Sequence, residues 1–151
     1  MPGRRIGVIT FDLWDCVFCD ETDEPKRAAA GLPPKPEARR QLLHEALCRH
    51  ALVDRHLVDI AFNVADQAFR KVWHEQYVTW TTKERIQVIL AGLNRNLPQS
   101  DLAEVVDAIE RMELDHSPDL APGVGDALAA LHGKYKLAVI SDAIFTPGKY
   151  L

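Results

Sequence analysis

Two side chains that could take part in a reaction each follow directly on a short apolar run. Asp12 follows residues 6–11, and Ser141 follows residues 136–140. Runs of this kind predict buried parallel strands, and open α/β sheets hold ligands and reactive groups at the carboxyl ends of such strands. A carboxylate or hydroxyl there can also be a turn residue, because it accepts hydrogen bonds from nearby backbone N–H groups. Spacing alone leaves a catalytic and a structural interpretation open.

A second group with chemical potential is the C-x-x-C pair formed by Cys16 and Cys19. It could be redox-active or supply half of a zinc site. Its acidic flanks disfavour a reactive thiolate, and a structural zinc would need two further ligands from Cys48 and scattered histidines. The odd number of cysteines argues against a disulfide framework. We therefore expect the pair to have no chemical role.

The segment between the two strand-like runs has mostly helical periodicity. Residues 20–36 carry a charge cluster and four prolines, which predict a loop. Four amphipathic helices follow, the third opening with a Thr81–Glu84 capping box, and together they predict a small antiparallel bundle. Residues 122–132 predict one more helix before the second run. The inward positions are expected to be Leu43, Ala46 and Leu47; Leu57, Ile60, Ala61, Val64, Ala68 and Val72; Ile86, Ile89, Leu90 and Leu93; and Leu102, Val105, Val106, Ile109 and Met112.

The composition excludes several classes of function. A formal charge of −4 and a pI near 5.8 give no reason to expect binding to nucleic acid. No stretch approaches the ~18 apolar residues that span a bilayer, and the first apolar run is interrupted too early for a signal peptide. We expect a cytoplasmic protein that binds a small molecule and neither nucleic acid nor membrane.

Two strand-like runs that end in polar groups, with a helical insertion between them, resemble the haloacid dehalogenase (HAD) superfamily. The sequence FDLWDCV is similar to its first motif, LAVISDA to its second, and SDAIFTPGKYL to the segment that follows the second motif. The resemblance implies an α/β fold. Residues 1–19 and 117–151 would form a partial Rossmann-like core of parallel strands, and residues 20–116 an inserted helical cap of the C1 type.

The resemblance also implies roles for individual residues. Asp12 would be the nucleophile that forms an aspartyl ester, and Ser141 would hydrogen-bond the transferred group. Trp14, Asp142 and Arg39 are the candidate contacts to a small anionic substrate, although for Arg39 and its neighbour Arg40 we favour a solvated helix face. The Asp12 carboxylate and the backbone carbonyl of Trp14 would supply part of a Mg²⁺ shell.

The sequence departs from the family at several positions. Trp14 stands where the phosphatases carry a general acid, which favours dehalogenase-like chemistry or an atypical phosphatase. Asp15 and Cys16 replace the usual Gly-Thr pair, and the lysine and acidic residues of the third and fourth motifs have no counterpart. We therefore expect a weakly active or inactive chain, with an inactive helical interaction module as the alternative. An unpaired apolar edge of the first strand would favour association, for example as a homodimer.

Overall fold

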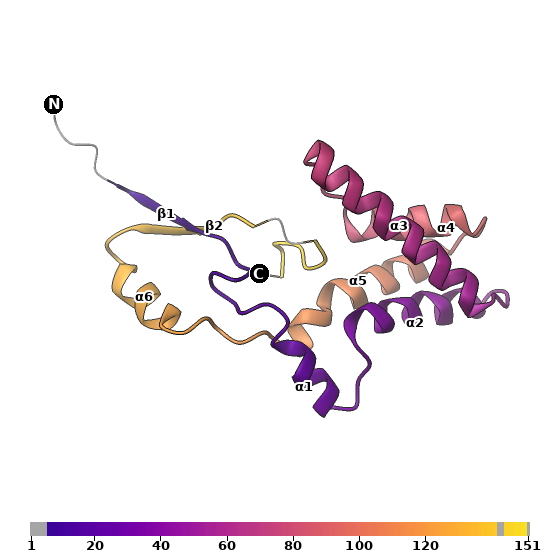
Figure 1. The fold of residues 1–151 in the computed structure, drawn as a ribbon, viewed down its shortest axis with the longest axis horizontal. Helices are drawn as coiled ribbons and strands as arrows, with labels where there is room; N and C mark the ends of the chain where they lie inside the picture. Colours follow the sequence, from indigo (N-terminus) through magenta and orange to yellow (C-terminus); the bar gives the residue numbers. More distant parts are fainter. Residues whose placement is uncertain (1–5, 142–143, 151) are drawn as a thin grey trace.

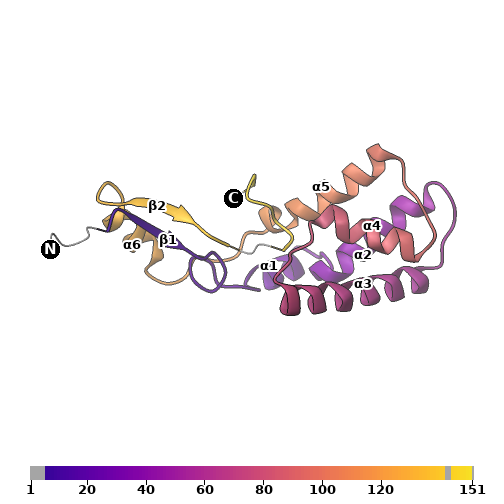
Figure 2. The same cartoon turned by 90° about the horizontal axis from the view of Figure 1, so that it is seen from above.

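The computed structural model describes residues 6–141 and 144–150. Figures 1 and 2 show an elongated molecule, with both strands and the last helix at one end and the other helices at the opposite end. The elements in chain order are β1 (Val8–Phe11), α1 (Asp23–Ala29), α2 (Lys35–Cys48), α3 (Arg55–Gln76), α4 (Thr82–Gly92), α5 (Gln99–Asp115), α6 (Val124–Leu131) and β2 (Lys136–Val139).

The expected α/β fold with a partial Rossmann-like core is wrong. Within the described residues the protein is mostly helical, with six helices and two strands of four residues each. A Rossmann-like sheet needs several parallel strands with helices on both faces. Only two segments of the described chain form strands, and most of the rest is helical. The two strands are parallel, as expected, but they form the whole of the described sheet.

The helices α2 to α5 surround the main hydrophobic core. The expected capping box at the start of α4 is confirmed: the Glu84 amide donates to Thr81 Oγ1, and the Thr81 amide donates to Glu84 Oε2. Among the helices described, none is long and apolar enough to cross a membrane. The buried residues of this core are Leu43, Ala46, Leu47, Val58, Phe62, Ala65, Ile86, Ile89, Leu90, Leu102, Val105 and Ile109.

The inward face of α3 is not the one expected from the sequence. Leu57, Ile60 and Val64 are exposed. The adjacent stripe is buried instead, and it contains two phenylalanines. Burying a phenylalanine removes more apolar area from water than burying an aliphatic side chain, so the stripe with Phe62 and Phe69 faces the core. The helix is rotated by about one residue from the expected orientation.

This rotation predicts opposite results for two neighbouring substitutions in α3. Val58 is fully buried, whereas Leu57 is 51% exposed. Val58→Ala should lower the free energy of unfolding by on the order of 2 kcal/mol, because it removes buried methyl groups and leaves a cavity. Leu57→Ala should change it by less than about 0.5 kcal/mol. Urea unfolding followed by circular dichroism measures both, and a larger loss for Leu57→Ala would contradict the orientation.

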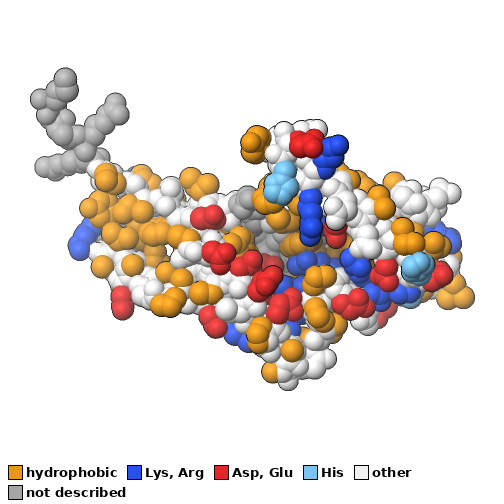
Figure 3. Space-filling view, viewed as in Figure 1, with side chains coloured by type: hydrophobic (Ala, Val, Ile, Leu, Met, Phe, Trp, Pro, Cys, Tyr) orange, Lys and Arg blue, Asp and Glu red, His pale blue; other side chains and the backbone are white. Residues whose placement is uncertain are grey.

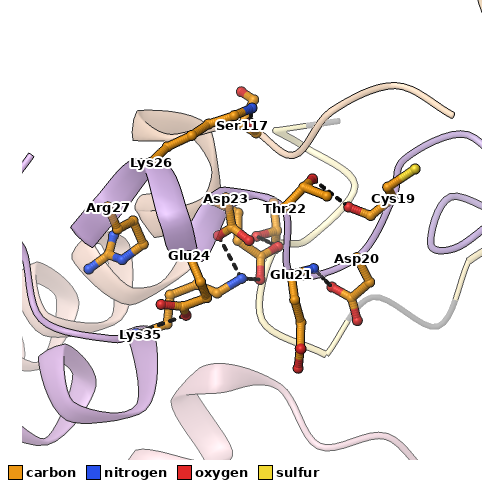
Figure 4. A network of polar contacts seen from close by, with 12 residues as sticks. Cys19, Asp20, Glu21, Thr22, Asp23, Glu24, Lys26, Arg27, Lys35 and Ser117 are labelled. Atoms are coloured by element: carbon orange, nitrogen blue, oxygen red, sulfur yellow. Dashed lines mark hydrogen bonds and ion pairs between the residues drawn. The ribbon is translucent and has the colours of Figure 1, made fainter. Parts of the chain in front are cut away.

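The loop expected over residues 20–36 contains α1, so that expectation is also wrong. The buried residues of α1 are charged: Asp23 and Arg27. Figure 4 shows Asp23 facing Lys35, and their charged groups lie 2.7 Å apart. The inward face of α1 is held by ion pairs and hydrogen bonds, so no hydrophobic periodicity marks the helix in the sequence.

Two chain segments connect the strands to the helical bundle, and they run side by side. The Cys19 amide donates to the Asp119 carbonyl at 2.8 Å, and the Ala121 amide donates to the Val17 carbonyl at 2.9 Å. The Asp119 amide also donates to the Thr22 hydroxyl oxygen at 2.8 Å. These hydrogen bonds fix where the bundle begins relative to the carboxyl ends of the strands.

The end of the molecule that holds the strands has an apolar surface. Val8, Val139 and Ile140 are all more than half exposed, and no residue of α6 is buried. Each strand pairs with the other along one edge, so each leaves its second edge free within the described residues. The apolar runs that predicted buried strands are therefore largely accessible to solvent.

Candidate functional site

Asp12 and Ser141 follow the same end of the strand pair. In the register of β1 and β2, Phe11 lies opposite Val139, and the Ile140 amide donates to the Phe11 carbonyl at 2.9 Å. Asp12 is exposed, and its Oδ1 accepts a hydrogen bond from the Leu13 amide at 2.7 Å. Both residues therefore lie at the carboxyl end of the strand pair, as the sequence predicts. Asp142, the third polar residue expected here, lies outside the described residues.

The Ser141 hydroxyl is positioned differently from the Asp12 carboxylate. Its oxygen is shielded from solvent and has no hydrogen-bond partner among the described residues. A buried polar atom without a partner costs free energy. No described residue therefore uses the hydrogen-bonding capacity of this hydroxyl.

The loop after Asp12 makes a tight turn. Leu13 and Val17 are buried, and the Val17 amide donates to the Leu13 carbonyl at 2.9 Å. Asp15 has a positive φ of 53°, and its carboxylate accepts from the Asp20 amide at 3.2 Å. The Asp15 carboxylate therefore helps to hold the loop.

Trp14 faces a cavity between this loop and the helical bundle, which we call the junction cavity. It measures about 320 Å³, and Trp14, Arg39, Trp73 and Phe145 contribute to its wall. The structure thus brings Trp14 and Arg39, two of the expected substrate contacts, to one space. Neither Asp12 nor Ser141 is among the residues that line it.

The junction cavity carries charges of both signs. Four carboxylates contribute to its wall, together with Lys35 and Arg39. Glu113 lies 3.5 Å from the Lys35 ammonium and 3.9 Å from the Arg39 guanidinium. An anion would be repelled by most of this wall and attracted only toward Lys35 and Arg39. The carboxylate residues are Asp20, Glu21, Glu24 and Glu113.

Arg39 is buried, so the expected solvated helix face is wrong for this residue. Its guanidinium carbon lies 3.4 Å from the centroid of the Phe145 ring. Burial lowers the pKa of Arg39 to about 10, with Glu113 opposing this shift and the nearby Arg85 adding to it. Its neighbours therefore neutralise this cation only in part. Arg40, the next residue, is half-buried and donates to Asn63.

Sequence reasoning missed Arg85 and Phe145. Arg85 is buried in α4, where it donates to Asp66 at 2.6 Å. It lies four residues before Ile89, on the inward side of the helix. That spacing is the signal that could have identified it, since an arginine on an apolar face needs an anionic or aromatic neighbour.

The expected magnesium ligands do not fit a magnesium site by themselves. Asp12 and the Trp14 carbonyl offer two oxygens, whereas Mg²⁺ prefers near-octahedral oxygen coordination. Within residues 6–141 and 144–150, no three histidine, cysteine, aspartate or glutamate side chains form a group that could hold a metal. Cys16 is exposed, Cys19 is partly exposed, and neither is in a disulfide. A zinc role for this pair thus has no third ligand in the described part of the chain.

Comparison with models of known protein families finds none that matches the chain. A search of curated proteins also finds no match. The inferences below therefore rest on the motifs and on the geometry described above.

Proposed function

We propose that the protein is a hydrolase of the HAD kind that uses Asp12 as its nucleophile on a small anionic substrate. The observation that carries this proposal is the parallel pairing of β1 and β2. It places Asp12 and Ser141 directly after the carboxyl ends of neighbouring strands. The unpartnered hydroxyl of Ser141 supports a role in binding the group that is transferred.

The proposed reaction is a displacement at carbon. An oxygen of the Asp12 carboxylate forms a bond to the substrate carbon, and the carbon–halogen bond breaks as halide leaves with the electron pair. Water then adds to the ester carbonyl, which releases the alcohol and a proton and restores the carboxylate. Halide needs no proton on departure, which suits a site with Trp14 in place of a general acid. For that reason we favour a halide over a phosphate ester.

Two further expectations belong to this proposal. Asp142, next to Ser141, would contact the substrate. A cytoplasmic location agrees with three cysteines that are all free. No step of the proposed reaction passes through magnesium, because the donors present do not complete its shell.

An isotope experiment tests the covalent step. The protein is mixed in excess with a short-chain 2-haloacid in H₂¹⁸O for a single turnover, and the peptide that contains Asp12 is analysed by mass spectrometry. Attack by Asp12 predicts that ¹⁸O enters the Asp12 carboxylate and that the product of this first turnover is unlabelled. Product labelled in the first turnover, with an unlabelled Asp12, would show direct attack by water and exclude the proposal.

A second candidate function is binding to a protein partner without catalysis. The exposed apolar side chains of β1 and β2 and the absence of buried residues in α6 favour it. A second copy of the chain pairing along the free edge of β1 would give the expected homodimer. The same isotope experiment separates the two candidates, because a binding module would release no halide and label neither Asp12 nor product.

A further inference from the structure

A second cavity lies inside the helical bundle, which we call the bundle cavity. It measures about 320 Å³ and is bounded by α2, α3, α4 and residues 144–145. This volume is at the lower end of the range of small-molecule sites. Figure 3 shows lysine and arginine side chains gathered beneath the projecting end of α3, on the side where this cavity lies.

The charged wall of the bundle cavity is mainly cationic. It consists of four arginines and one aspartate, Asp66. Arg39 and Arg85 are buried, Arg40 is half-buried and Arg70 is exposed. The positive charge therefore extends from the interior to the rim, where it would attract an anion from solution.

The two buried guanidinium groups have hydrogen-bonding capacity left over. Arg85 Nη2 donates to Asp66, but Arg85 Nη1 and Arg39 Nε have no partner among the described residues, although both are shielded from solvent. The nearest carboxylate oxygen to Arg39, on Glu113, lies 3.9 Å away. Buried donors on charged groups are costly when unpaired, so an anion that accepts hydrogen bonds from these arginines would be stabilised.

Aromatic rings complete the wall. The Arg85 guanidinium carbon lies 4.4 Å from the centroid of Phe69 and 4.3 Å from that of Phe145. The rings of Phe69 and Trp73 are stacked nearly parallel, with centroids 6.3 Å apart and an angle of 10° between their planes. Flat apolar walls beside cationic donors suit a flat apolar molecule that carries an anionic group.

We propose that the bundle cavity binds a small aromatic carboxylate. Its carboxylate would accept hydrogen bonds from Arg39 and Arg85, whose planar guanidinium groups match carboxylate geometry. Its ring would lie against Phe62, Phe69 and Trp73. Neither Asp12 nor Ser141 lines this cavity, so binding here does not depend on the proposed hydrolase activity.

Isothermal titration calorimetry with benzoate on the full chain tests this site. Saturable binding is expected for benzoate and not for benzamide, which has the same ring without the charge. Arg85→Gln should weaken benzoate binding at least about tenfold, because it removes a charged hydrogen-bond donor from a buried site. Arg55→Gln removes an arginine from an ion pair outside the cavity and should leave the affinity unchanged. Asp12→Asn should also leave it unchanged.

Asp66→Asn gives an effect of the opposite sign. It removes the carboxylate that competes for Arg85, so benzoate should bind more tightly than to the unsubstituted chain. If Arg85→Gln does not fold, the affinity of Asp66→Asn for benzoate tests the proposal in its place. The proposal is overturned by absent benzoate binding, by equal binding of benzamide, by a folded Arg85→Gln with full affinity, or by weaker binding to a folded Asp66→Asn. Tighter binding of phenyl phosphate than of benzoate would overturn the assignment to a carboxylate.

Discussion

Replacing Asp12 with asparagine is expected to reduce halide release from a 2-haloacid to background, by roughly 10³-fold or more. The amide has the same shape but cannot act as the nucleophile. It can still accept the hydrogen bond that the Leu13 amide gives to Oδ1. Because Asp12 is exposed, the free energy of unfolding should change by less than about 0.5 kcal/mol. The loss of activity would therefore report on chemistry and not on folding.

The matched control for this substitution is Asp15→Asn. Asp15 is also exposed, lies three residues further along the same loop and accepts from the Asp20 amide. Halide release by this variant should stay within about threefold of the unsubstituted rate, because surface substitutions of this kind perturb the fold little. Ion chromatography of released halide is sensitive enough for a weakly active chain. Equal losses for both variants, or retained activity in Asp12→Asn, would contradict the assignment of Asp12.

Replacing Asp23 with alanine is expected to lower the free energy of unfolding by roughly 3–5 kcal/mol. Asp23 is fully buried, and its carboxylate lies 2.7 Å from the ammonium group of Lys35, which is itself buried. The substitution leaves that cation in the interior, where Glu113, at 3.5 Å, is its remaining ion-pair partner among the described residues. Urea unfolding measures the loss as a shift of the transition midpoint.

A double substitution separates the lost ion pair from the lost packing. Asp23→Leu combined with Lys35→Met removes both charges and keeps apolar volume, so it should cost less than Asp23→Ala alone. Glu37→Ala is the surface control, since it removes an exposed carboxylate 2.6 Å from Arg55 and should cost less than about 1 kcal/mol. A cost for Asp23→Ala no larger than for Glu37→Ala would show that the buried pair contributes little.

The sequence predicted those parts of the fold that depend on local apolar patterning. The capping box at Thr81 and the four helices of the bundle follow from periodicity and end signals. Helix α1 does not, because its buried residues are charged: Asp23 pairs with Lys35, and Arg27 donates to the Pro33 carbonyl. Neither does the orientation of α3, where two adjacent apolar stripes compete and only tertiary packing decides between them.

The candidate sites also contain features that the sequence predicts and features that only tertiary packing decides. The positions of Asp12 and Ser141 at the carboxyl end of the strand pair follow from two apolar runs and parallel pairing. The buried state of Arg39 could not be predicted, since it depends on Phe145, which lies over its guanidinium group from the far end of the chain. The two apolar runs predicted buried strands, but the strands are largely exposed. Apolar composition favours burial, but burial also requires other elements that pack against the strands.

The difference in burial between the two ends of the molecule has a consequence for local stability. Amide protons in α2 and α5 are protected by a packed core, so their exchange with solvent requires an opening that disrupts the bundle. The amides of β1, β2 and α6 lack such packing, and opening there exposes little additional apolar surface. The carboxyl end of the strand pair, where Asp12 and Ser141 lie, thus belongs to the part of the molecule that opens at least cost. A ligand bound there would slow hydrogen exchange in β1 and β2 first.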